Sequence, residues 1–365
     1  MIVVAKIGTS SITTDAGAID DSAVHKFCAE AFALREAGHR VVLVTSGAIA
    51  AGLPALGFPD GTRPRDAVTL QAASAVGQSR LMQVYETGLA RHGMVGGQVL
   101  LAPLDFMERQ QYLHARTTLT RLLQLGVVPV VNENDAIADD EIRFGDNDRL
   151  AALVAHLVDA DVLVLLTDAA GVFTADPRVD ETASLIEEVL EIDAELEALA
   201  GGTGTDRGSG GMASKLAAAK IASWSGVRAV IAAAGRPGVL VDAVAGAPGV
   251  GTVFRPRERR LPARKLWIAF AVGASGTVVV DDGARSALLD RNVSLLPAGV
   301  LEVHGRFVAD DAVELAGPDG KVFAKGLVRV DATTLATLAG RRTSDLPDGT
   351  PHEVVHRDDL VLLAR

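Results

Sequence analysis

The sequence predicts an α/β protein with a mainly parallel sheet covered by helices on both faces, followed by a smaller, mostly β domain. Three observations support this prediction. Apolar strands lead into small polar turns and then helices, first at residues 2–10 and again at residues 41–48. This alternation is typical of parallel sheets. A charged stretch with two prolines at residues 254–265 then interrupts the hydrophobic pattern, and short strand-like runs follow it.

Composition limits the class of protein. With 365 residues, of which 48% are hydrophobic, the chain is long enough for two domains with sizeable cores. The net charge of −11 argues against a protein that mainly binds nucleic acid. The single cysteine, Cys28, excludes an internal disulfide and suits a buried helical position. The sequence shows neither a signal-like segment nor an apolar run of membrane-spanning length, so we expect a cytoplasmic protein.

The first predicted strand, residues 2–7, contains Lys6 and ends in Gly8, Thr9 and Ser10. A lysine in a buried strand is costly unless its charge has a partner. Two interpretations are open: an edge strand that turns Lys6 to solvent, or a lysine that faces phosphate. The small donors that follow at once favour phosphate.

A helix predicted over residues 21–37 ends at Gly38, and a second buried strand at residues 41–44 leads into Ser46. Ligands in parallel sheets bind at the carboxyl ends of strands. Thr9, Ser10 and Ser46 are therefore candidate ligand contacts. Ser46 alone is also a typical helix N-cap.

Two polar clusters follow later in the chain, after helices at residues 69–90 and 108–125 and a short strand at 98–101. The strand at residues 127–131 leads into the first cluster, residues 132–135, which includes Asp135. Asp146, Asn147 and Asp148 open a helix at residues 149–158. Turn or N-cap chemistry explains any one of these residues, but two such clusters indicate a site. The two aspartates suit lysine ammonium groups or Mg²⁺, and Asn147 suits a substrate carboxylate or amine.

The rest of this domain continues the alternation. The most apolar strand, residues 162–166, precedes Thr167 and Asp168, and a turn-rich loop at residues 171–178 could wall an adenine pocket. A short helix is predicted at residues 192–200. Residues 229–234 are predicted as the last strand of the domain.

The stretch at residues 201–220, GGTGTDRGSGGMASKLAAAK, carries glycines and then helix formers from about Met212 onward. Glycines let backbone N–H groups approach a ligand, and a helix start adds its positive dipole end. A surface linker is the alternative, but a lysine, Lys215, in the first turn of the helix favours a triphosphate cradle. The spacing matches neither the P-loop nor the Rossmann fingerprint.

The charged stretch divides the chain into residues 1–256, a linker at 257–272 and a second domain at 273–365. Short strands are predicted at residues 277–280, 300–303, 312–315 and 327–330. Asp-Gly turns at Asp282–Gly283 and Asp319–Gly320 separate some of them. A small, mostly β domain is therefore expected.

The assembled motifs resemble the glutamate 5-kinase group of the amino acid kinase family over nearly the whole chain. The matching stretches are VVAKIGTS, VLVTSGAIAAG, VPVVNENDA, FGDND, VLLTDAAGVFTADPR and GSGGMASK. The tail resembles a PUA domain through GTVVVDDGARSALLDRNVSLLPAGV and VVHRDDL. One departure is DRGSGGM, where many relatives have GLGTGGM. Arg207 adds charge beside the phosphates and Ser209 keeps a hydroxyl, so we expect an effect on nucleotide affinity rather than on reaction class.

The resemblance implies an amino acid kinase-like three-layer sandwich and ATP-dependent phosphorylation of the γ-carboxylate of L-glutamate, the first step of proline synthesis. It implies that Lys6 and Lys215 act on the transferring phosphoryl group and that Asp148 holds both ammonium groups. Glutamate is assigned to Ser46, Asp135 and Asn147. The residues that the resemblance assigns to the nucleotide are Lys6, Gly8, Thr9, Thr167, Asp168, Ser209, Gly210, Gly211, Met212, Ala213, Ser214 and Lys215.

Mg²⁺ is expected to enter with ATP and to need few dedicated protein ligands. No general base is required, because the attacking carboxylate is already ionised at neutral pH. The family also suggests proline feedback inhibition and a homo-oligomer, either a dimer or a tetramer.

Two alternatives remain open. Within enzymes, the acceptor could be another small acid, such as aspartate or carbamate. From a different class, the PUA-like tail could make this an RNA-binding protein. Acidic and basic residues roughly balance in that tail, so a structural or regulatory role is preferred and nucleic acid is not an expected partner.

Overall fold

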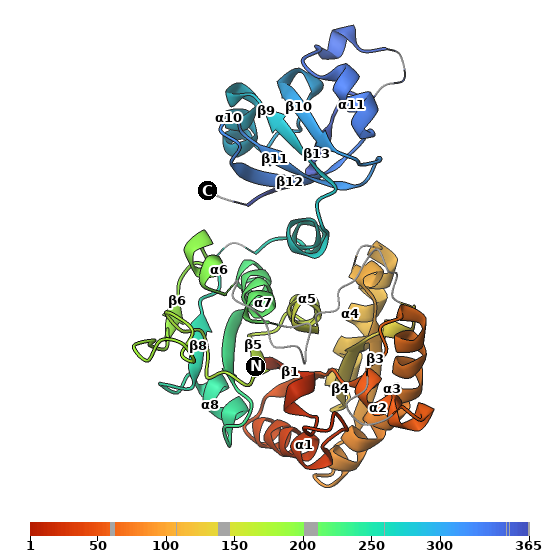
Figure 1. Ribbon diagram of the computed structural model, residues 1–365, viewed down its shortest axis with the longest axis vertical. Helices are drawn as coiled ribbons and strands as arrows, with labels where there is room; N and C mark the ends of the chain where they lie inside the picture. The colour runs from red at the N-terminus through yellow and green to blue at the C-terminus, as the bar shows by residue number, and fades with distance from the viewer. Residues whose placement is uncertain are drawn as a thin grey trace. The chain divides into compact units, whose positions relative to one another are not determined.

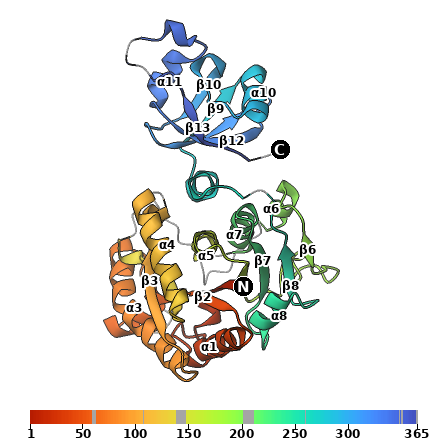
Figure 2. The same cartoon turned by 180° about the vertical axis from the view of Figure 1, so that it is seen from behind.

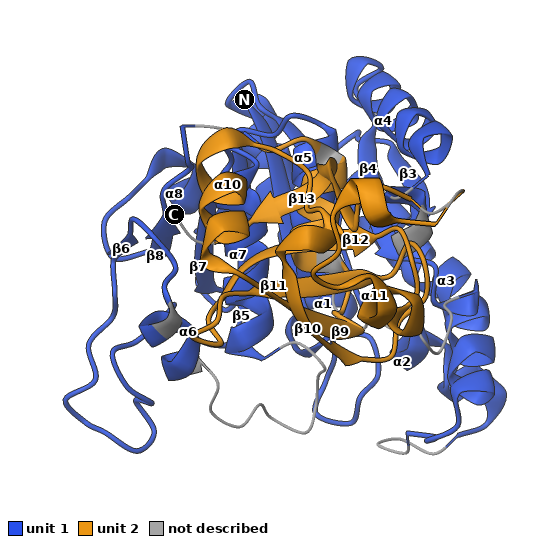
Figure 3. Cartoon of the chain, turned by 90° about the horizontal axis from the view of Figure 1, so that it is seen from above, with its two compact units in different colours: residues 1–260 blue, residues 261–365 orange. Residues whose placement is uncertain are grey.

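The structure is a computed structural model and describes residues 1–58, 63–106, 108–137, 147–200, 211–258, 260–347, 349 and 351–363. The chain forms two compact units, Met1–Arg260 and Leu261–Arg365, which Figure 3 colours separately. Each unit has its own sheet and its own hydrophobic core.

A mainly parallel sheet forms the centre of the first unit (Figure 1). In order across the sheet, its strands are β3 (Gly96–Leu101), β4 (Val128–Glu133), β2 (Arg40–Val44), β1 (Ile2–Ile7), β5 (Val162–Thr167), β7 (Arg228–Ala233), β8 (Gly251–Phe254) and β6 (Glu188–Val189). The central strands β1, β4 and β5 are buried along almost their whole length, as expected of a parallel sheet covered on both faces.

Helices cover both faces of this sheet. On one face, α1 (Asp21–Glu36) packs against α3 (Ala67–Ala90) and α8 (Val239–Ala245). The opposite layer contains α4 (Arg109–Gln124), α5 (Asn147–Leu157) and α7 (Met212–Trp224), as Figures 1 and 2 both show. Two shorter helices are α2 (Ala48–Gly52) and α6 (Ala194–Ala200). The predicted three-layer α/β fold is confirmed.

The strand order defines where ligands are expected to bind. β1 pairs in parallel with β2 on one side and with β5 on the other. The chain leaves β1 toward β2, β3 and β4, and then crosses through α5 to β5 on the opposite side of β1. The order therefore reverses between β1 and β5, and open α/β sheets bind ligands outside the carboxyl ends of strands at such a point.

The main helices of this unit start and end at local signals. The Asp20 side chain accepts hydrogen bonds from the N–H groups of Ser22 and Ala23 at the start of α1, and Asp66 accepts one from Thr69 at the start of α3. Gly38 has a φ of 81° just after α1, a conformation that glycine adopts without the cost that a Cβ imposes.

Helices α2 and α3 cross with almost no space between their backbones. A Cβ added to Gly52 would lie 1.9 Å from the carbonyl oxygen of Ala73, and one added to Gly77 would lie 1.7 Å from that of Ala48. Only glycine fits at these two positions. The crossing fixes α2, and with it the end of the loop that carries Ser46, against α3.

The prediction that residues 229–234 form the last strand of this domain is wrong. After β7 the chain forms β8, which pairs with β7 in the antiparallel sense. β8 is only four residues long and begins with glycine, so its local pattern is too short to distinguish a strand from a loop, although Thr252, Val253 and Phe254 favour strands. Pairing with β7 stabilises it, and this contact is not visible in a local pattern.

The second unit contains a mixed five-stranded sheet (Figure 1). Its strands, in order across the sheet, are β10 (Val300–Gly305), β9 (Gly276–Val280), β11 (Ala312–Ala316), β12 (Val322–Val328) and β13 (Val355–Leu362). β9 and β11 are parallel, and the other neighbours are antiparallel. The unit also contains the helices α10 (Asp282–Arg291) and α11 (Ala332–Leu338). The small β-rich domain is confirmed.

Two local predictions in this unit need correction. Asp282–Gly283 is not a turn between strands but the start of α10, where Asp281 caps the helix by accepting from the N–H of Ala284. Aspartate and glycine are common both in turns and at helix starts, so this dipeptide alone does not distinguish a turn from the start of a helix. The strand predicted at 327–330 is β12, which begins five residues earlier than predicted, at Val322.

The segment predicted as a linker, residues 257–272, is partly helical. It contains α9 (Ala263–Leu266) and a π-helical turn, Trp267–Ala271. Leu266 and Ile268 are fully buried.

Candidate active site

Polar residues from distant parts of the chain follow parallel strands at one edge of the sheet. Gly8 and Thr9 follow β1, Ser46 follows β2, and Asp135 follows β4. Thr167 is the last residue of β5. Because these strands are parallel, their carboxyl ends share one edge, which is the predicted location of the site.

Two lysines contact the same carboxylate. The Nζ of Lys6 lies 2.6 Å from Oδ1 of Asp148, and the Nζ of Lys215 lies 3.1 Å from Oδ2. Lys6 comes from β1, Asp148 from the first turn of α5 and Lys215 from near the start of α7. Since β1 is a central strand, the interpretation that turned Lys6 to solvent on an edge strand is wrong.

This cluster is buried and carries net positive charge. The side chain of Asp148 is 0% exposed, and that of each lysine is 6% exposed. Burial alone raises the pKa of Asp148, but the charges of Lys6 and Lys215, with hydrogen bonds from Lys6 and Ser214, hold it below its ordinary value. One carboxylate between two ammonium groups leaves a charge of +1 on the three side chains. Such a cluster suits an anion such as phosphate.

The start of α7 adds to this cluster. The Oγ of Ser214 lies 2.9 Å from Oδ2 of Asp148 and 3.1 Å from the carbonyl oxygen of Gly211. Gly211 is the N-cap of this 13-residue helix and provides no capping side chain. The positive end of the helix dipole therefore adds to the charge of the lysines, so these residues fit a nucleotide phosphate group.

A second set of contacts ties together three segments beside this cluster. The Nδ2 of Asn147 donates a 3.0 Å hydrogen bond to the Oγ of Ser46. The backbone N–H of Glu133 donates to the Oδ1 of Asn147 at 3.3 Å. The alternative role of Ser46 as a helix N-cap is wrong, because Gly47, with a φ of 94°, occupies that position before α2.

Asp135 lies in a short 3₁₀ turn, Asp135–Ile137, that follows β4. The Oγ of Ser74, on α3, donates a 3.0 Å hydrogen bond to its Oδ2. Burial raises the pKa of Asp135, while the hydrogen bond from Ser74 and the charge of Arg63 oppose this effect. Asp135 is thus a desolvated carboxylate, suited to pair with an ammonium group.

On the other side of the switch point, Thr167 and Asp168 are adjacent and interact. The hydroxyl of Thr167 donates to Oδ1 of Asp168 at 2.9 Å. The carbonyl of Thr167 accepts a 2.7 Å hydrogen bond from the N–H of Ala234, which ties the end of β5 to the end of β7. Thr167 is buried and Asp168 is exposed.

Some predicted residues lie outside the described part of the chain. These are Ser209 and Gly210, together with Asp146 and Arg207. Among the described residues, Lys6, Asp148, Ser214 and Lys215 form one contact cluster, and Ser46 and Asn147 form another. The nucleotide roles of Gly8, Thr9, Met212 and Ala213 stay predictions.

The sequence analysis missed Ser74, Gln78 and Tyr85 on α3. All three are buried on the side of α3 that faces the core. Tyr85 Oη lies 2.8 Å from the Oγ1 of Thr45, the residue before Ser46. The available signal was their spacing of four and seven residues, or one and two helical turns, because polar side chains on the apolar stripe of a helix need buried partners.

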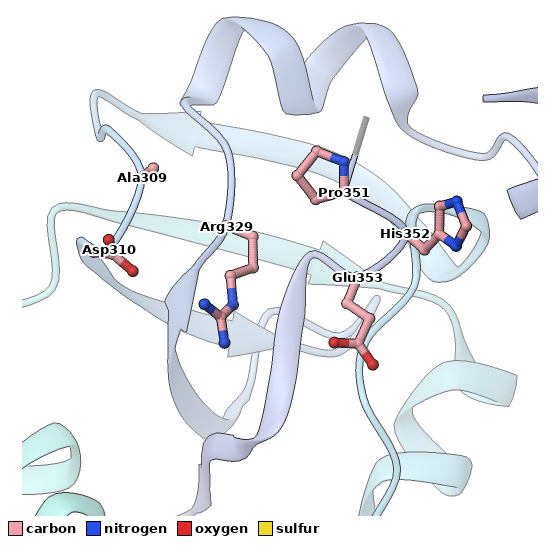
Figure 4. Close-up of a pocket in the computed structure, with 6 residues that line it drawn as sticks. All are labelled: Ala309, Asp310, Arg329, Pro351, His352 and Glu353. Carbon is pink, nitrogen blue, oxygen red and sulfur yellow. The ribbon is translucent and has the colours of Figure 1, made fainter. Parts of the chain in front are cut away.

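One cavity among the described residues belongs to the second unit. It has a volume of about 760 Å³, and its lining residues, drawn in Figure 4, are Ala309, Asp310, Arg329, Pro351, His352 and Glu353. None of these is a predicted site residue. Arg329 also pairs with Asp359 at 3.0 Å. The cavity therefore adds nothing to the lysine–carboxylate cluster.

Within the residues that the structure describes, no group of three or more His, Cys, Asp or Glu side chains is placed to hold a metal ion. The helices that these residues form are all too short or too polar to cross a bilayer.

Comparison with known proteins places the chain in a family. The model of the amino acid kinase family matches residues 1–233, and that of the PUA domain matches residues 276–349. A protein of Frankia casuarinae named glutamate 5-kinase is 48% identical over 367 residues, which cover 99% of this chain and 96% of the relative. A glutamate 5-kinase of Pelobacter propionicus is 44% identical over 365 residues, with 99% and 97% covered.

Solved structures share the fold of the first unit. Carbamate kinase from Giardia lamblia, bound to AMP-PNP, superimposes with a TM-score of 0.51 and 17% identity, over 70% of this chain and 98% of that one. At this identity the likeness concerns the fold alone. The near-complete match to the curated relatives is more specific, and it shows that this chain belongs to the glutamate 5-kinase group of the amino acid kinase family, with a PUA domain in its C-terminal part.

Proposed function

We propose that this chain transfers the γ-phosphoryl group of ATP to the γ-carboxylate of L-glutamate and so forms L-glutamyl 5-phosphate, the first step of proline synthesis. The observation that carries the proposal is the buried contact of Lys6 and Lys215 with Asp148, directly beside Asn147 and its partner Ser46. The names and the 44–48% identity of the curated relatives support the choice of acceptor.

The two lysines would stabilise the transferring phosphoryl group. Phosphoryl transfer between two anions needs positioning and charge neutralisation more than covalent chemistry by the protein. Lys6 and Lys215 reach Asp148 from different elements, so Asp148 fixes both ammonium groups before the nucleotide binds. Such a preorganised pair stabilises the charge of the transition state without rearrangement.

Mg²⁺ would bind with ATP and neutralise part of the phosphate charge. We assign the N–H groups at the start of α7 to the phosphates, and Thr167 and Asp168 to the nucleotide side of the site. This follows from their position across the switch point from Ser46.

The acceptor side would hold glutamate by its α-ammonium group and by its carboxylates. Asp135 suits the α-ammonium group because its carboxylate is partly desolvated and near the end of β4. Asn147 and Ser46 provide amide and hydroxyl groups for the carboxylates. The γ-carboxylate of glutamate is ionised at neutral pH, so it attacks without a general base.

The decisive experiment is a substrate panel with MgATP. The purified protein is assayed with L-glutamate, L-aspartate, N-acetylglutamate and carbamate, and ADP release is compared with hydroxamate formed in hydroxylamine. An acyl phosphate is a mixed anhydride and is trapped as a hydroxamate. Aspartate is one methylene shorter, so it loses in-line alignment as well as contact. Discrimination should then exceed the roughly 10–200-fold available from a methylene in an apolar pocket.

Each outcome of this panel decides between the alternatives. Fastest turnover with L-glutamate supports the proposal. Faster turnover with any of the other three would overturn the assignment of glutamate. Absence of turnover on all four would favour a binding protein, including one that binds RNA through the PUA domain.

We further propose a cytoplasmic homo-oligomer, a dimer or a tetramer, that proline inhibits. Light scattering of the purified chain tests the oligomer, and glutamate kinetics with and without proline test the inhibition. Nucleic acid is not a proposed partner, because the chain carries a net charge of −11.

A further inference from the structure

Helix α3 presents two polar side chains, one helical turn apart, to the loop that follows β4. Ser74 is fully buried, and Gln78 is 9% exposed. The rest of the buried side of α3 is mainly apolar or glycine. Two buried polar groups in such a stripe need partners, and these partners belong to the acceptor side of the proposed site.

The amide of Gln78 is held at both ends. Its Nε2 donates to the carbonyl oxygen of Glu133 at 3.2 Å. Its Oε1 accepts from the Nδ2 of Asn132 at 3.3 Å and from the Nε2 of Gln98 at 3.5 Å. Because donor and acceptor ends are both used, the amide has one satisfied orientation. Gln78 thereby fixes the last two residues of β4.

Glu133 also connects Gln78 to the residues that are proposed to contact glutamate. The N–H of Glu133 donates to Asn147, and Asn147 donates to Ser46. A shift of Glu133 would therefore move the amide of Asn147. Gln78 therefore acts on Asn147 indirectly, through hydrogen bonds to the backbone of Glu133.

Ser74 contacts Asp135, the residue proposed to bind the α-ammonium group of glutamate. Its hydroxyl donates to Oδ2 of Asp135, and it is the only hydrogen bond to that carboxylate found among the described residues. The neighbouring Gly77 packs against the carbonyl of Ala48 in the tight crossing with α2. One face of α3 thus contacts both the loop after β4 and the helix after Ser46.

We propose that Ser74 and Gln78 are positioning residues for the acceptor amino acid. They act through Asp135, Glu133 and Asn147, and set where the carboxylate of the acceptor lies relative to the phosphoryl group. The inference rests on the proposed glutamate kinase function and names residues that determine acceptor affinity at that site.

The test compares Gln78→Met and Ser74→Ala with two variants from the exposed side of α3, Gln83→Met and Ser79→Ala. Steady-state kinetics are measured for the whole chain with glutamate and with ATP. Loss of these hydrogen bonds leaves Asp135 and the end of β4 less firmly placed, so KM for glutamate should rise on the order of tenfold. KM for ATP should stay within about twofold, because the nucleotide contacts are on other elements. The exposed-side variants should match the unmodified chain.

A double-mutant cycle separates positioning from general weakening of the fold. If Ser74 acts through Asp135, Ser74→Ala should raise KM for glutamate no further in a chain that already carries Asp135→Ala. Additive effects would overturn this role. For Gln78, equal losses of affinity for glutamate and ATP, or unchanged kinetics, would overturn the proposal. If Gln78→Met fails to fold, Gln78→Glu, which loses the donor to the carbonyl of Glu133 but keeps an acceptor, takes its place and should raise KM for glutamate in the same way.

Failure of the inference is distinguishable from failure of the proposed function. An unmodified chain that does not phosphorylate glutamate contradicts the function itself. An active unmodified chain whose variants keep a normal KM for glutamate contradicts only the positioning role.

Discussion

The Nδ2 of Asn147 lies 3.0 Å from the Oγ of Ser46, although 101 residues separate them in the chain. The next residue, Asp148, contacts Lys6 and Lys215. The first two residues of α5 therefore join the proposed acceptor contacts to the lysine–carboxylate cluster. Changes on the two sides should thus have different kinetic signatures.

Lys215→Ala is expected to lower kcat on the order of a hundredfold or more, with a smaller effect on KM for glutamate. The lost charge matters most in the transition state. Lys220→Ala is the matched control, since Lys220 lies on the same helix and pairs with Glu197 at the surface. A near-normal kcat for Lys215→Ala would contradict the proposed role of the cluster.

Asn147→Ala and Asp135→Ala are expected to raise KM for glutamate while nucleotide binding stays nearly intact. Both residues lie on the proposed acceptor side of the cluster, where Asn147 contacts Ser46 and Asp135 contacts Ser74. Calorimetry with a non-hydrolysable ATP analogue measures the nucleotide affinity. Loss of that affinity in both variants would assign these residues to the nucleotide half of the site.

Glutamate affinity is expected to weaken as the pH falls, because burial raises the pKa of Asp135. The protonated carboxyl cannot pair with the α-ammonium group, so KM for glutamate should rise as pH falls toward that raised pKa. Measurements of KM between about pH 5 and pH 8 test this. Asp135→Asn should remove this pH dependence, and an unchanged profile in that variant would exclude Asp135 as its source.

Stability is expected to fall in mild acid partly through His156. Burial lowers the pKa of His156 from 6.5 to about 4; the charges of Arg116 and Arg260 add to this effect, and that of Asp159 opposes it. Between these values the unfolded chain binds a proton that the folded chain does not, so stability is lost as pH falls through this range. Urea unfolding across this range should show a flatter profile for His156→Gln. His304→Gln, at an exposed position, should behave like the unmodified chain.

A chain that ends at Arg260 is expected to fold and to keep kinase activity. Every proposed site residue lies in the first unit, which has its own sheet and core. Circular dichroism and the glutamate assay test this expectation. An insoluble or inactive product at several nearby end points would show that the second unit completes the first.

Short-range sequence patterns predicted most of the local elements and identified the residues of the lysine–carboxylate cluster. The strand Ile2–Ile7 and the start of α7 at Met212 follow from short-range patterns: an apolar run, and glycines before helix formers. Lys6 was singled out because a charge in a buried strand needs a partner. Lys215 was singled out by its place in the first turn of the helix after the glycines, and Asp148 by its place in a polar cluster. The pairing of the three was implied by the family resemblance.

The partners of these elements became visible only in the folded structure. β8 depends on pairing with β7, and the roles of Ser74 and Gln78 depend on how α3 lies against the end of β4. Likewise, Gly47 rather than Ser46 caps α2, which leaves Ser46 to contact Asn147. Such contacts join residues that are far apart in the chain, so their hydrogen bonds and burial leave no periodic local pattern from which they could be predicted.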